Sequence, residues 1–467
     1  MGPLIGLGDK IGELRRVICL LVERHVSMIN HNPQMHLAAF LIAGPVAHSH
    51  ALWRNPAHDV PFLTIEYYIE IARALEQGKF DLLFFADRLA IGDRLGGNQL
   101  TGIRYGDQDS TRMDPVPILG ALAAVTRHIG LGATRSTTYD QPYSIAREFR
   151  TLDHLSKGRA AWNVVTSMND GEAWNYGIDT HLDHDRRYDR ADEFMEVMFK
   201  LWDSWEPDAL ILDRASGIYA DPSKVHYINH AGAYFKTRGP LNIPSSPQGR
   251  PVIIQAGSSD RGRQFAARWA EVIFSISPTP ELMGKFRSGV HEDLAAVGRP
   301  PAACKILPAV MPFVGKTLAE ATDKRDTHNA LVDPMVGLST LAAHANFDFS
   351  QMNLDAPVDQ LRSGGTQGLI ATVSRIAKDA NMTLKDVGRR YGESVMVPQI
   401  CGTGTQVAEQ LAETFTAGAC DGFVISPAFL PDSFREFAEQ VVPHLQRLGV
   451  FREEYRSRTL RDHLSAA

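Results

Sequence analysis

The sequence predicts an α/β protein that folds as a (β/α)8 TIM barrel with insertions. Eight short apolar segments alternate with helical segments along most of the 467 residues. Parallel strands are buried on both faces, so they form nearly continuous apolar runs. Eight such units fit a closed barrel better than a doubly wound sheet. We divide the chain into an N-terminal extension at 1–34, a barrel at 35–450 and a C-terminal tail at 451–467.

The strands are predicted from apolar runs that end at glycine, proline or a polar turn. The first run, HLAAFLIA, ends at Gly44 and Pro45, and the second, FDLLFFA, ends at Asp87. The strands are expected at 36–43, 80–86, 129–133, 160–165, 252–256, 272–275, 306–314 and 422–426.

The helices between them are predicted from apolar residues spaced three and four apart, and 189–202 shows this pattern most strongly. Two insertions interrupt the alternation. The first, at about 205–250, contains HYINHAGAYFKTRG, which is typical of an antiparallel hairpin; the second, at about 332–400, is expected to be irregular and then helical. Long insertions in a compact domain are usually functional. The helices are expected at 64–77, 116–126, 144–155, 189–202, 262–269, 280–297, 318–328 and 433–448.

Composition narrows the class of protein. The net charge of −6 provides no basic excess for nucleic acid or a membrane surface, and the sequence has no apolar run of about 18 residues. The four cysteines form no CxxC pair, so we expect free thiols in a reducing cytoplasm. Residues 1–34 are expected to be a poorly ordered extension or sequence upstream of the true start, with Met28 and Met35 as alternative initiators.

Reacting residues of a TIM barrel lie at the carboxyl ends of its strands. The second strand ends in Asp87-Arg88, the third leads into Thr134, and the fourth runs through Asn163 to Ser167. The fifth is followed by the Gly-Ser-Ser turn, residues 257–259, which opens a helix near Arg261 and Arg263. Free N–H groups and the helix dipole at such a turn favour an anion, most naturally a phosphate. The alternative is a helix that is simply capped by serine.

The histidine-rich segment 179–192, DTHLDHDRRYDRAD, does not have the i, i+4 histidine spacing of a zinc protease helix. We predict no metal site and expect a solvated loop that caps the next helix, although His184 and Tyr188 are candidate ligand contacts. His48 and His50 follow the first strand, and one of them is a candidate to line the pocket.

Several strings together carry a family resemblance. The chain resembles the bacterial luciferase-like FMN-dependent monooxygenases, in the branch that holds nitrilotriacetate monooxygenase component A, dibenzothiophene-sulfone monooxygenase and one of the two pristinamycin synthase proteins. The resemblance runs from about residue 35 to about residue 450. The strings are MHLAAFL at 35–41, FDLLFFADRLA at 80–90, EFRTLDHLSKGRAAWNVVTS at 148–167, HDRRYDRADEFMEVMFKLW at 184–202, FKTRGPLNIPSSPQGRPVIIQAGSS at 235–259 and AEVIFS at 270–275.

The resemblance implies a barrel that binds reduced FMN supplied by a separate NAD(P)H:flavin reductase. O2 is the implied co-substrate, and a C4a-peroxyflavin would oxygenate a small organic substrate. It also implies a homodimer or homotetramer. Asn163 and His344 are the implied catalytic residues, and the second insertion, with Gly364-Gly365 as its hinge, is the implied lid. The family's flavin contacts fall on Asp87, Thr134, Ser167, His184, Tyr188, Ser258 and Ser259.

Two questions stay open at the level of sequence. Many members of the family have a small residue where Arg88 stands; this arginine either attracts an anionic substrate or forms an outward salt bridge. The alternative functions are an F420-dependent oxidoreductase of the same superfamily and a non-catalytic flavin-binding protein. The sequence does not indicate whether carbon, nitrogen or sulfur is oxidised.

Overall fold

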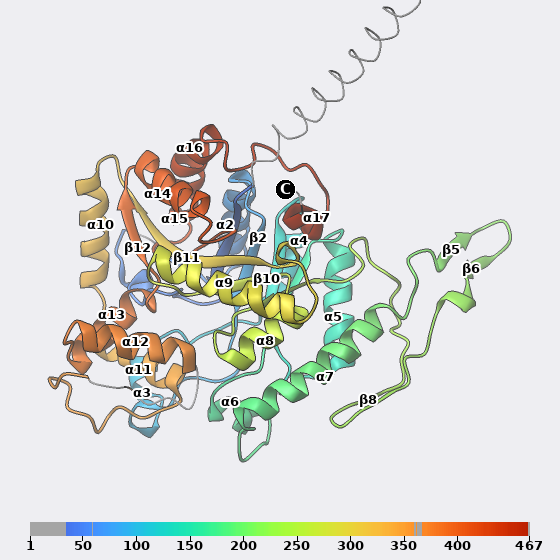
Figure 1. Ribbon diagram of the computed structural model, residues 1–467, viewed down its shortest axis with the longest axis horizontal. Helices are drawn as coiled ribbons and strands as arrows, with labels where there is room; N and C mark the ends of the chain where they lie inside the picture. The colour runs from blue at the N-terminus through green and yellow to red at the C-terminus, as the bar shows by residue number, and fades with distance from the viewer. Residues whose placement is uncertain (1–33, 58, 359–360, 362–366, 466–467) are drawn as a thin grey trace, which may run out of the picture.

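Eight parallel strands close into a barrel, as the sequence predicts (Figure 1). The computed structural model describes residues 34–57, 59–358, 361 and 367–465. The strand order is β10-β9-β4-β3-β2-β1-β13-β11, and β10 pairs back onto β11. All eight predicted strands are present: β1 His36–Ile42, β2 Leu82–Ala86, β3 Gly130–Ser136, β4 Ala160–Val165, β9 Val252–Gln255, β10 Val272–Ser275, β11 Lys305–Val314 and β13 Gly422–Ile425.

The predicted helices surround this barrel, with two differences. Helix α7 begins at His184, before the expected residue 189, because its polar first turn conceals the apolar periodicity. The segment predicted as one helix at 433–448 contains a π-helical turn, Phe437–Val441, just before Pro443, which has no N–H to continue the α-helical pattern. The helices are α2 Ile65–Gln77, α4 Pro115–Val125, α5 Pro142–Leu155, α7 His184–Trp202, α8 Asp260–Trp269, α9 Pro280–Ala296, α10 Leu318–Ala330, α15 Asp432–Glu436 and α16 Val442–Arg447.

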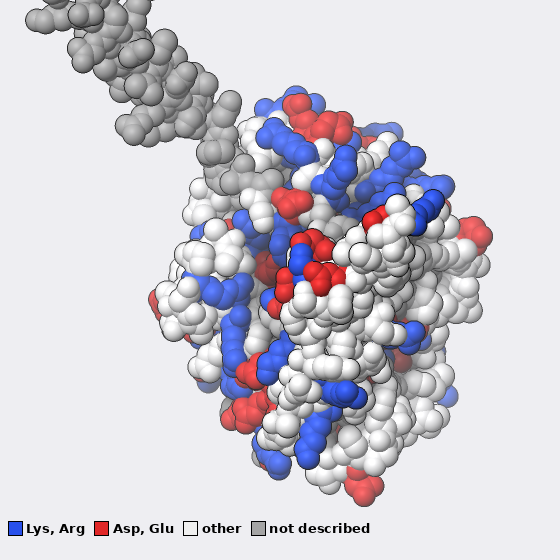
Figure 2. All heavy atoms as spheres, turned by 90° about the vertical axis from the view of Figure 1, so that its right-hand side faces the viewer, with Lys and Arg blue, Asp and Glu red and all other residues white. Residues whose placement is uncertain are grey.

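The first insertion extends away from the barrel (Figure 1). The predicted hairpin is present as β7 His230–Ala231 and β8 Lys236–Thr237, and β5 Leu210–Asp213 pairs with β6 Ile218–Ala220. Ile211, Leu212 and Tyr219 are exposed on this β5–β6 arm. On the face shown in Figure 2, acidic and basic side chains are interspersed among wide uncharged areas. This face therefore has no continuous basic surface of the kind that nucleic acid requires.

The second insertion is helical from its start, so the expectation of an irregular first part is wrong. Helix α11, Pro334–Ala345, begins with proline, and the Asp333 side chain accepts a hydrogen bond from the Met335 N–H at 2.8 Å. Its many small residues weakened the apolar signal. Helices α12, Gln367–Asp379, and α13, Leu384–Ser394, follow, and the proposed hinge Gly364-Gly365 lies outside the described residues.

A separate apolar core holds the second insertion together. It includes Leu341, Phe349, Ile370 and Tyr391, whereas the barrel and its helices share a larger cluster. Gly337 of α11 lies directly against α13, since a Cβ atom there would lie 1.8 Å from the Gly388 carbonyl oxygen. Strand β12, Gln399–Gly402, was not predicted; it leads out of the insertion and pairs with the carboxyl half of β11.

The end of the chain closes the opposite mouth of the barrel. Residues 451–467 were predicted as a tail, and they contain helix α17, Leu460–Ser465, with Leu460 fully buried. The Leu460 N–H donates to the Gly158 carbonyl at 3.0 Å, and Arg461 pairs with Glu271 at 2.6 Å. The predicted extension, at 1–34, lies outside the described residues except for its last one. Over the described ranges, no helix has the length and apolarity that crossing a bilayer would require.

Candidate active site

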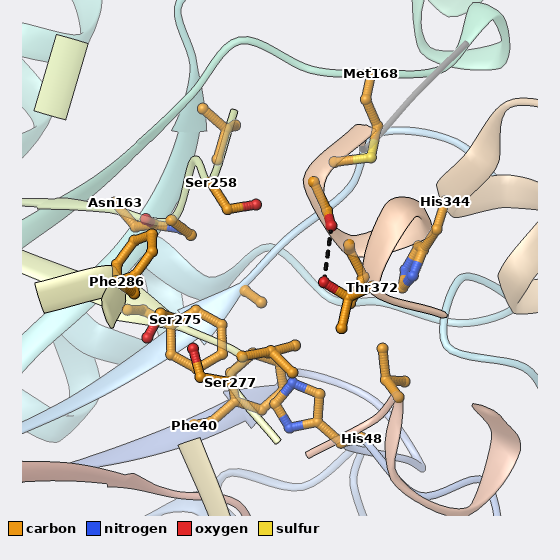
Figure 3. A pocket seen from close by; sticks show the side chains of 18 of the residues that line it. Phe40, His48, Asn163, Met168, Ser258, Ser275, Ser277, Phe286, His344 and Thr372 are labelled. Atoms are coloured by element: carbon orange, nitrogen blue, oxygen red, sulfur yellow. Dashed lines mark hydrogen bonds between the residues drawn. The ribbon is translucent and has the colours of Figure 1, made fainter. Parts of the chain in front are cut away.

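A cavity of about 740 Å³ opens at the carboxyl ends of the barrel strands. One wall comes from the barrel, with Asn163 of β4, Ser258 after β9 and Phe286 of α9 (Figure 3). The other wall comes from the second insertion, with His344 of α11 and Thr372 of α12. The pocket therefore lies between the two apolar cores, at the end of the barrel where chemistry is expected.

Five of the nine predicted site residues line this cavity, and four lie beside it. His184 and Ser259 join the first turns of α7 and α8, since the His184 Nε2 lies 3.3 Å from the Ser259 Oγ. The rings of His184 and Tyr188 are 5.1 Å apart. Ser167 bonds to Ser136 at 2.9 Å, with a positive φ of 53°. The five that line the cavity are Asp87, Thr134, Asn163, Ser258 and His344.

The Gly-Ser-Ser turn is both a helix cap and part of the pocket. Ser259 accepts a hydrogen bond from the Gly262 N–H at 3.1 Å, so the capping interpretation holds. Ser258 lines the cavity, and a Cβ at Gly257 would lie 2.5 Å from the Gln255 side chain. The remaining first-turn N–H groups of a helix have no partner within that helix, which leaves them for an anionic ligand. This geometry fits the phosphate of a cofactor.

The two arginines near this turn have different positions. Arg261 bonds to Asp189 at 3.0 Å and to Asp192 at 2.7 Å, and it does not line the cavity. Arg263 lines the cavity and pairs with Asp293 at 3.0 Å. Only one of the two cations expected at the anion site therefore reaches the pocket.

Asn163 presents an unsatisfied oxygen at the pocket. Its Nδ2 donates to the Thr134 Oγ1 at 2.8 Å, and the Thr134 hydroxyl donates to the Phe85 carbonyl at 2.8 Å. The buried Oδ1 of Asn163 has no hydrogen-bond partner among the described residues, and neither has the Ser275 Oγ. Buried polar groups are rarely left unpaired, so a ligand with N–H or O–H groups fits here. A flavin ring offers such a group.

Asp87 is a second group that responds to the pocket. Burial raises the pKa of this carboxyl to about 6, and the nearby Arg112 and Arg135 limit the rise. The Arg135 Nη1 lies 3.9 Å from the Asp87 Oδ2. Asp87 therefore changes charge close to neutral pH, as groups at functional sites often do.

Arg88 faces the cavity, but its charge is balanced. It donates to the Asp109 Oδ2 at 2.8 Å, and Arg112 donates to the Asp109 Oδ1 at the same distance. The Arg88 side chain is only 10% exposed, so the alternative of an outward salt bridge is wrong. The other alternative, attraction of an anionic substrate, is weakened because Asp109 is shared by both guanidinium groups.

Two neutral histidines line the pocket. Burial, with Arg88 and Arg112 nearby, lowers the pKa of His344 well below its usual value, and its Nδ1 hydrogen-bonds to the Tyr391 hydroxyl. Burial and His50 lower the pKa of His48 to about 3. Of the two histidines after β1, His48 lines the cavity, whereas His50 bonds to the Gly392 carbonyl at 2.9 Å.

An aromatic wall was missed by the sequence analysis. Phe40 stacks on His48 with ring centroids 3.8 Å apart and on Phe274 at 5.8 Å, and Phe84 meets Phe274 edge-on at 5.8 Å. All four side chains line the cavity. The available signal was strand alternation, since every second residue of a barrel strand points inward. Among the described residues, no group of three or more His, Cys, Asp or Glu side chains is arranged to hold a metal ion.

Comparison with known proteins places this pocket in a family context. A sequence model described as luciferase-like monooxygenase matches residues 46–421. Dibenzothiophene-sulfone monooxygenase from Rhodococcus erythropolis strain XP is 51% identical over 436 residues, which cover 92% of this chain and 96% of the relative. Nitrilotriacetate monooxygenase component A from Aminobacter aminovorans is 42% identical over 443 residues, covering 93% and 97%. A crystal structure of riboflavin lyase with modified FMN and the substrate riboflavin has a TM-score of 0.85 and 34% identity, covering 93% of this chain and 96% of the other.

Proposed function

The chain belongs to the luciferase-like monooxygenase family, and we propose that it oxygenates a small organic substrate with FMNH2 and O2. The observation that carries this proposal is the strand-end pocket, where the Gly-Ser-Ser turn and the unpartnered Asn163 Oδ1 face one cavity. The name of the relative called component A supports a second protein, which we propose is an NAD(P)H:flavin reductase. The modified FMN in the similar lyase structure supports the choice of cofactor.

We assign the cofactor to the barrel wall. Ser258 and the first turn of α8 would hold the phosphate, and the Asn163 Oδ1 would accept a hydrogen bond from the flavin ring. Asp87 and Thr134 line the same wall. When bound, reduced FMN supplies the electrons that activate O2. The roles of Ser167, His184, Tyr188 and Ser259 follow from the cluster described above, which supports the turn from behind.

The protein's own contribution is orientation and a dry pocket. The rings of Phe40, Phe84 and Phe274 make the floor of the cavity unfavourable for water. His344 and His48 are neutral, so neither adds a charge that would hold water there. The lid function of the second insertion, the homodimer or homotetramer and the cytoplasmic location stay predictions.

The test is an anaerobic titration of the full chain with reduced FMN, oxidised FMN and reduced riboflavin. We expect reduced FMN to bind more tightly than oxidised FMN. Reduced riboflavin should bind at least tenfold more weakly than reduced FMN, because it lacks the phosphate that the Gly-Ser-Ser turn would hold. Equally weak binding of FMN in both states would contradict the proposal, and tight binding of F420 instead would favour the deazaflavin alternative.

A second measurement tests the reaction. The protein is mixed with a flavin reductase, NADH, FMN and a panel of organic compounds under 18O2. Incorporation of one labelled oxygen atom into any compound, dependent on the reductase, is the expected result. Tight flavin binding with hydrogen peroxide as the only product across a broad panel would favour a non-catalytic flavin-binding role.

A further inference from the structure

Tyr391 and His344 form a buried pair behind one wall of the pocket. His344 lies on α11 and lines the cavity, whereas Tyr391 lies on α13 and is fully buried. The close crossing of these helices at Gly337 brings the Tyr391 hydroxyl to the His344 Nδ1. Figure 3 shows the His344 imidazole directed from the insertion toward the cavity. Tyr391 therefore acts on the pocket only through His344.

The hydrogen bond fixes which nitrogen of His344 carries the proton. Burial raises the pKa of Tyr391, so the hydroxyl keeps its proton, and the low pKa of His344 keeps the imidazole neutral. A neutral imidazole has one donor and one acceptor nitrogen. The charged group that acts most on the tyrosine is Arg88, which offers only donors. The Tyr391 hydroxyl therefore donates to Nδ1, and Nε2–H becomes the donor of His344.

The charges around the inner pocket are matched. The guanidinium groups of Arg88 and Arg112 bind both oxygens of Asp109, and the Asp87 carboxyl lies near Arg112. Lys285 and Arg375 also line the cavity, but both are exposed, so water and salt screen them. An anion that entered the inner pocket would lose its hydration without gaining an unpaired cation.

The opposite wall favours a flat ring. Phe40, Phe84, Phe274 and the neutral His48 form one stacked and edge-on group. Aromatic rings prefer offset or edge-on contacts with other rings. The cavity thus joins an apolar aromatic wall to a single N–H donor from His344.

We infer that the substrate is an uncharged aromatic compound that carries an acceptor oxygen, that His344 binds this oxygen through Nε2–H, and that Tyr391 is the positioning residue. The inference rests on the proposed function and names the substrate class of the same site. It replaces the expectation of an anionic substrate that Arg88 raised.

The first test measures binding with three probes of similar size. Diphenyl sulfone is neutral and has acceptor oxygens, diphenylmethane lacks them, and biphenyl-4-sulfonate is an anion. Isothermal titration of the FMN-loaded protein should give roughly tenfold tighter binding for diphenyl sulfone than for either other probe, the effect of one hydrogen bond of about 1–1.5 kcal/mol. Equal affinities, or a preference for biphenyl-4-sulfonate, would overturn the inference.

The second test assigns the preference to the residue pair. In Tyr391→Phe the imidazole loses its fixed tautomer, so the preference for diphenyl sulfone over diphenylmethane should fall severalfold. His344→Ala should abolish it, and His344→Gln, which keeps a side-chain N–H, should restore part of it. The double variant Tyr391→Phe/His344→Ala should show no loss beyond His344→Ala alone, as expected for residues that act as one unit.

Tyr68→Phe is the matched control. Tyr68 is equally buried, and its hydroxyl donates to the Phe62 carbonyl at 2.7 Å, away from the cavity. This variant should keep the full preference, and a loss like that of Tyr391→Phe would show a general effect of removing a buried hydroxyl. If the wild-type protein binds reduced FMN but shows no sulfone preference, only this inference fails; if it binds no reduced FMN, the proposed function itself fails.

Discussion

The side-chain amide of Asn163 is held at one end and open at the other. Its Nδ2 is fixed by Thr134, and its Oδ1 has no partner among the described residues. We expect Asn163→Ala to weaken reduced FMN binding by roughly tenfold, since one hydrogen bond contributes about 1–1.5 kcal/mol. Anaerobic fluorescence titration measures this. Asn242→Ala, at an exposed asparagine bonded to Tyr143, should leave the affinity unchanged, and equal affinities in all three proteins would refute the role of Asn163.

Asp87 provides a pH signature at the same wall. Because burial raises its pKa to about 6, the carboxyl is neutral below that pH and negative above it. A charge close to an anionic cofactor is unfavourable, so the affinity for reduced FMN should fall roughly threefold as the pH rises from about 5 to about 7, an interaction of about 0.7 kcal/mol. The phosphate also titrates in this range, so the informative quantity is the difference between wild type and Asp87→Asn. Identical pH profiles would exclude a contribution from Asp87.

Single residues show how far the sequence can be interpreted. Ser258 and Asn163 were placed correctly because their positions at strand ends determine where they lie. Arg261 was not, because the direction of a side chain around a helix depends on partners such as Asp189 on another element. Tyr391 carries no local signal at all, since its importance arises only from its contact with His344.

At the scale of elements, the crossing of α11 and α13 depends on glycine. A Cβ at residue 337 would overlap the Gly388 carbonyl and lie 2.7 Å from the Gly392 nitrogen, and backbone atoms cannot move aside as a flexible side chain can. We expect Gly337→Ala to destabilise the second insertion by about 1–3 kcal/mol. Limited proteolysis should then cut within this insertion first.

The matched control is Gly120→Ala in α4. No atom lies within 4 Å of a Cβ placed there, and alanine is a better helix former than glycine. This variant should therefore be neutral or slightly more stable in thermal unfolding. If Gly337→Ala behaved in the same way, the helices would be less tightly packed than described.

The predicted elements succeeded where burial on both faces gave a long apolar run, as in β2 and β4. They failed where small residues diluted the pattern. Helix α11 is buried along most of its length, yet Gly337, Ser339 and Ala343 give no amphipathic stripe. Strand β12 was missed because it has only four residues and pairs with β11 beyond the barrel closure.

At the scale of the whole molecule, a buried ion pair ties the chain end to the barrel. The Asp81 carboxylate pairs with Arg452 and with His36 at 3.2 Å, and it accepts a hydrogen bond from the Leu37 N–H at 2.9 Å. Burial alone would raise the pKa of Asp81, but Arg452 and His36 outweigh it and lower the pKa to about 2. Asp81→Asn should lower the free energy of unfolding at pH 7 by about 3 kcal/mol, because it leaves Arg452 without its partner.

The pH dependence follows from the sign of this shift. A lowered carboxyl pKa contributes stability that is fully present above the unfolded value of about 3.9 and is lost as the pH falls toward 2. Urea unfolding should therefore show a large difference between wild type and Asp81→Asn at pH 7 and a smaller one near pH 2. Asp208→Asn, at an exposed pair with Lys224, should match wild type at both pH values. A constant difference would rule out the linkage.

The architecture as a whole could be predicted from the sequence because eight repeats of one unit leave few alternatives. The site could be predicted only in its barrel half. Its other half depends on how α11, α12 and α13 fold over the strand ends, which is a tertiary packing question that no local pattern answers.

The division of the pocket between two apolar cores has a consequence for how such proteins diversify. Residues proposed to hold the cofactor are anchored in the barrel core, and His344 is anchored in the core of the second insertion. Substitutions in the insertion can alter what the enzyme accepts while the oxygen chemistry keeps its support. Engineering of new specificities would therefore start with libraries in α11, α12 and α13 on an unchanged barrel.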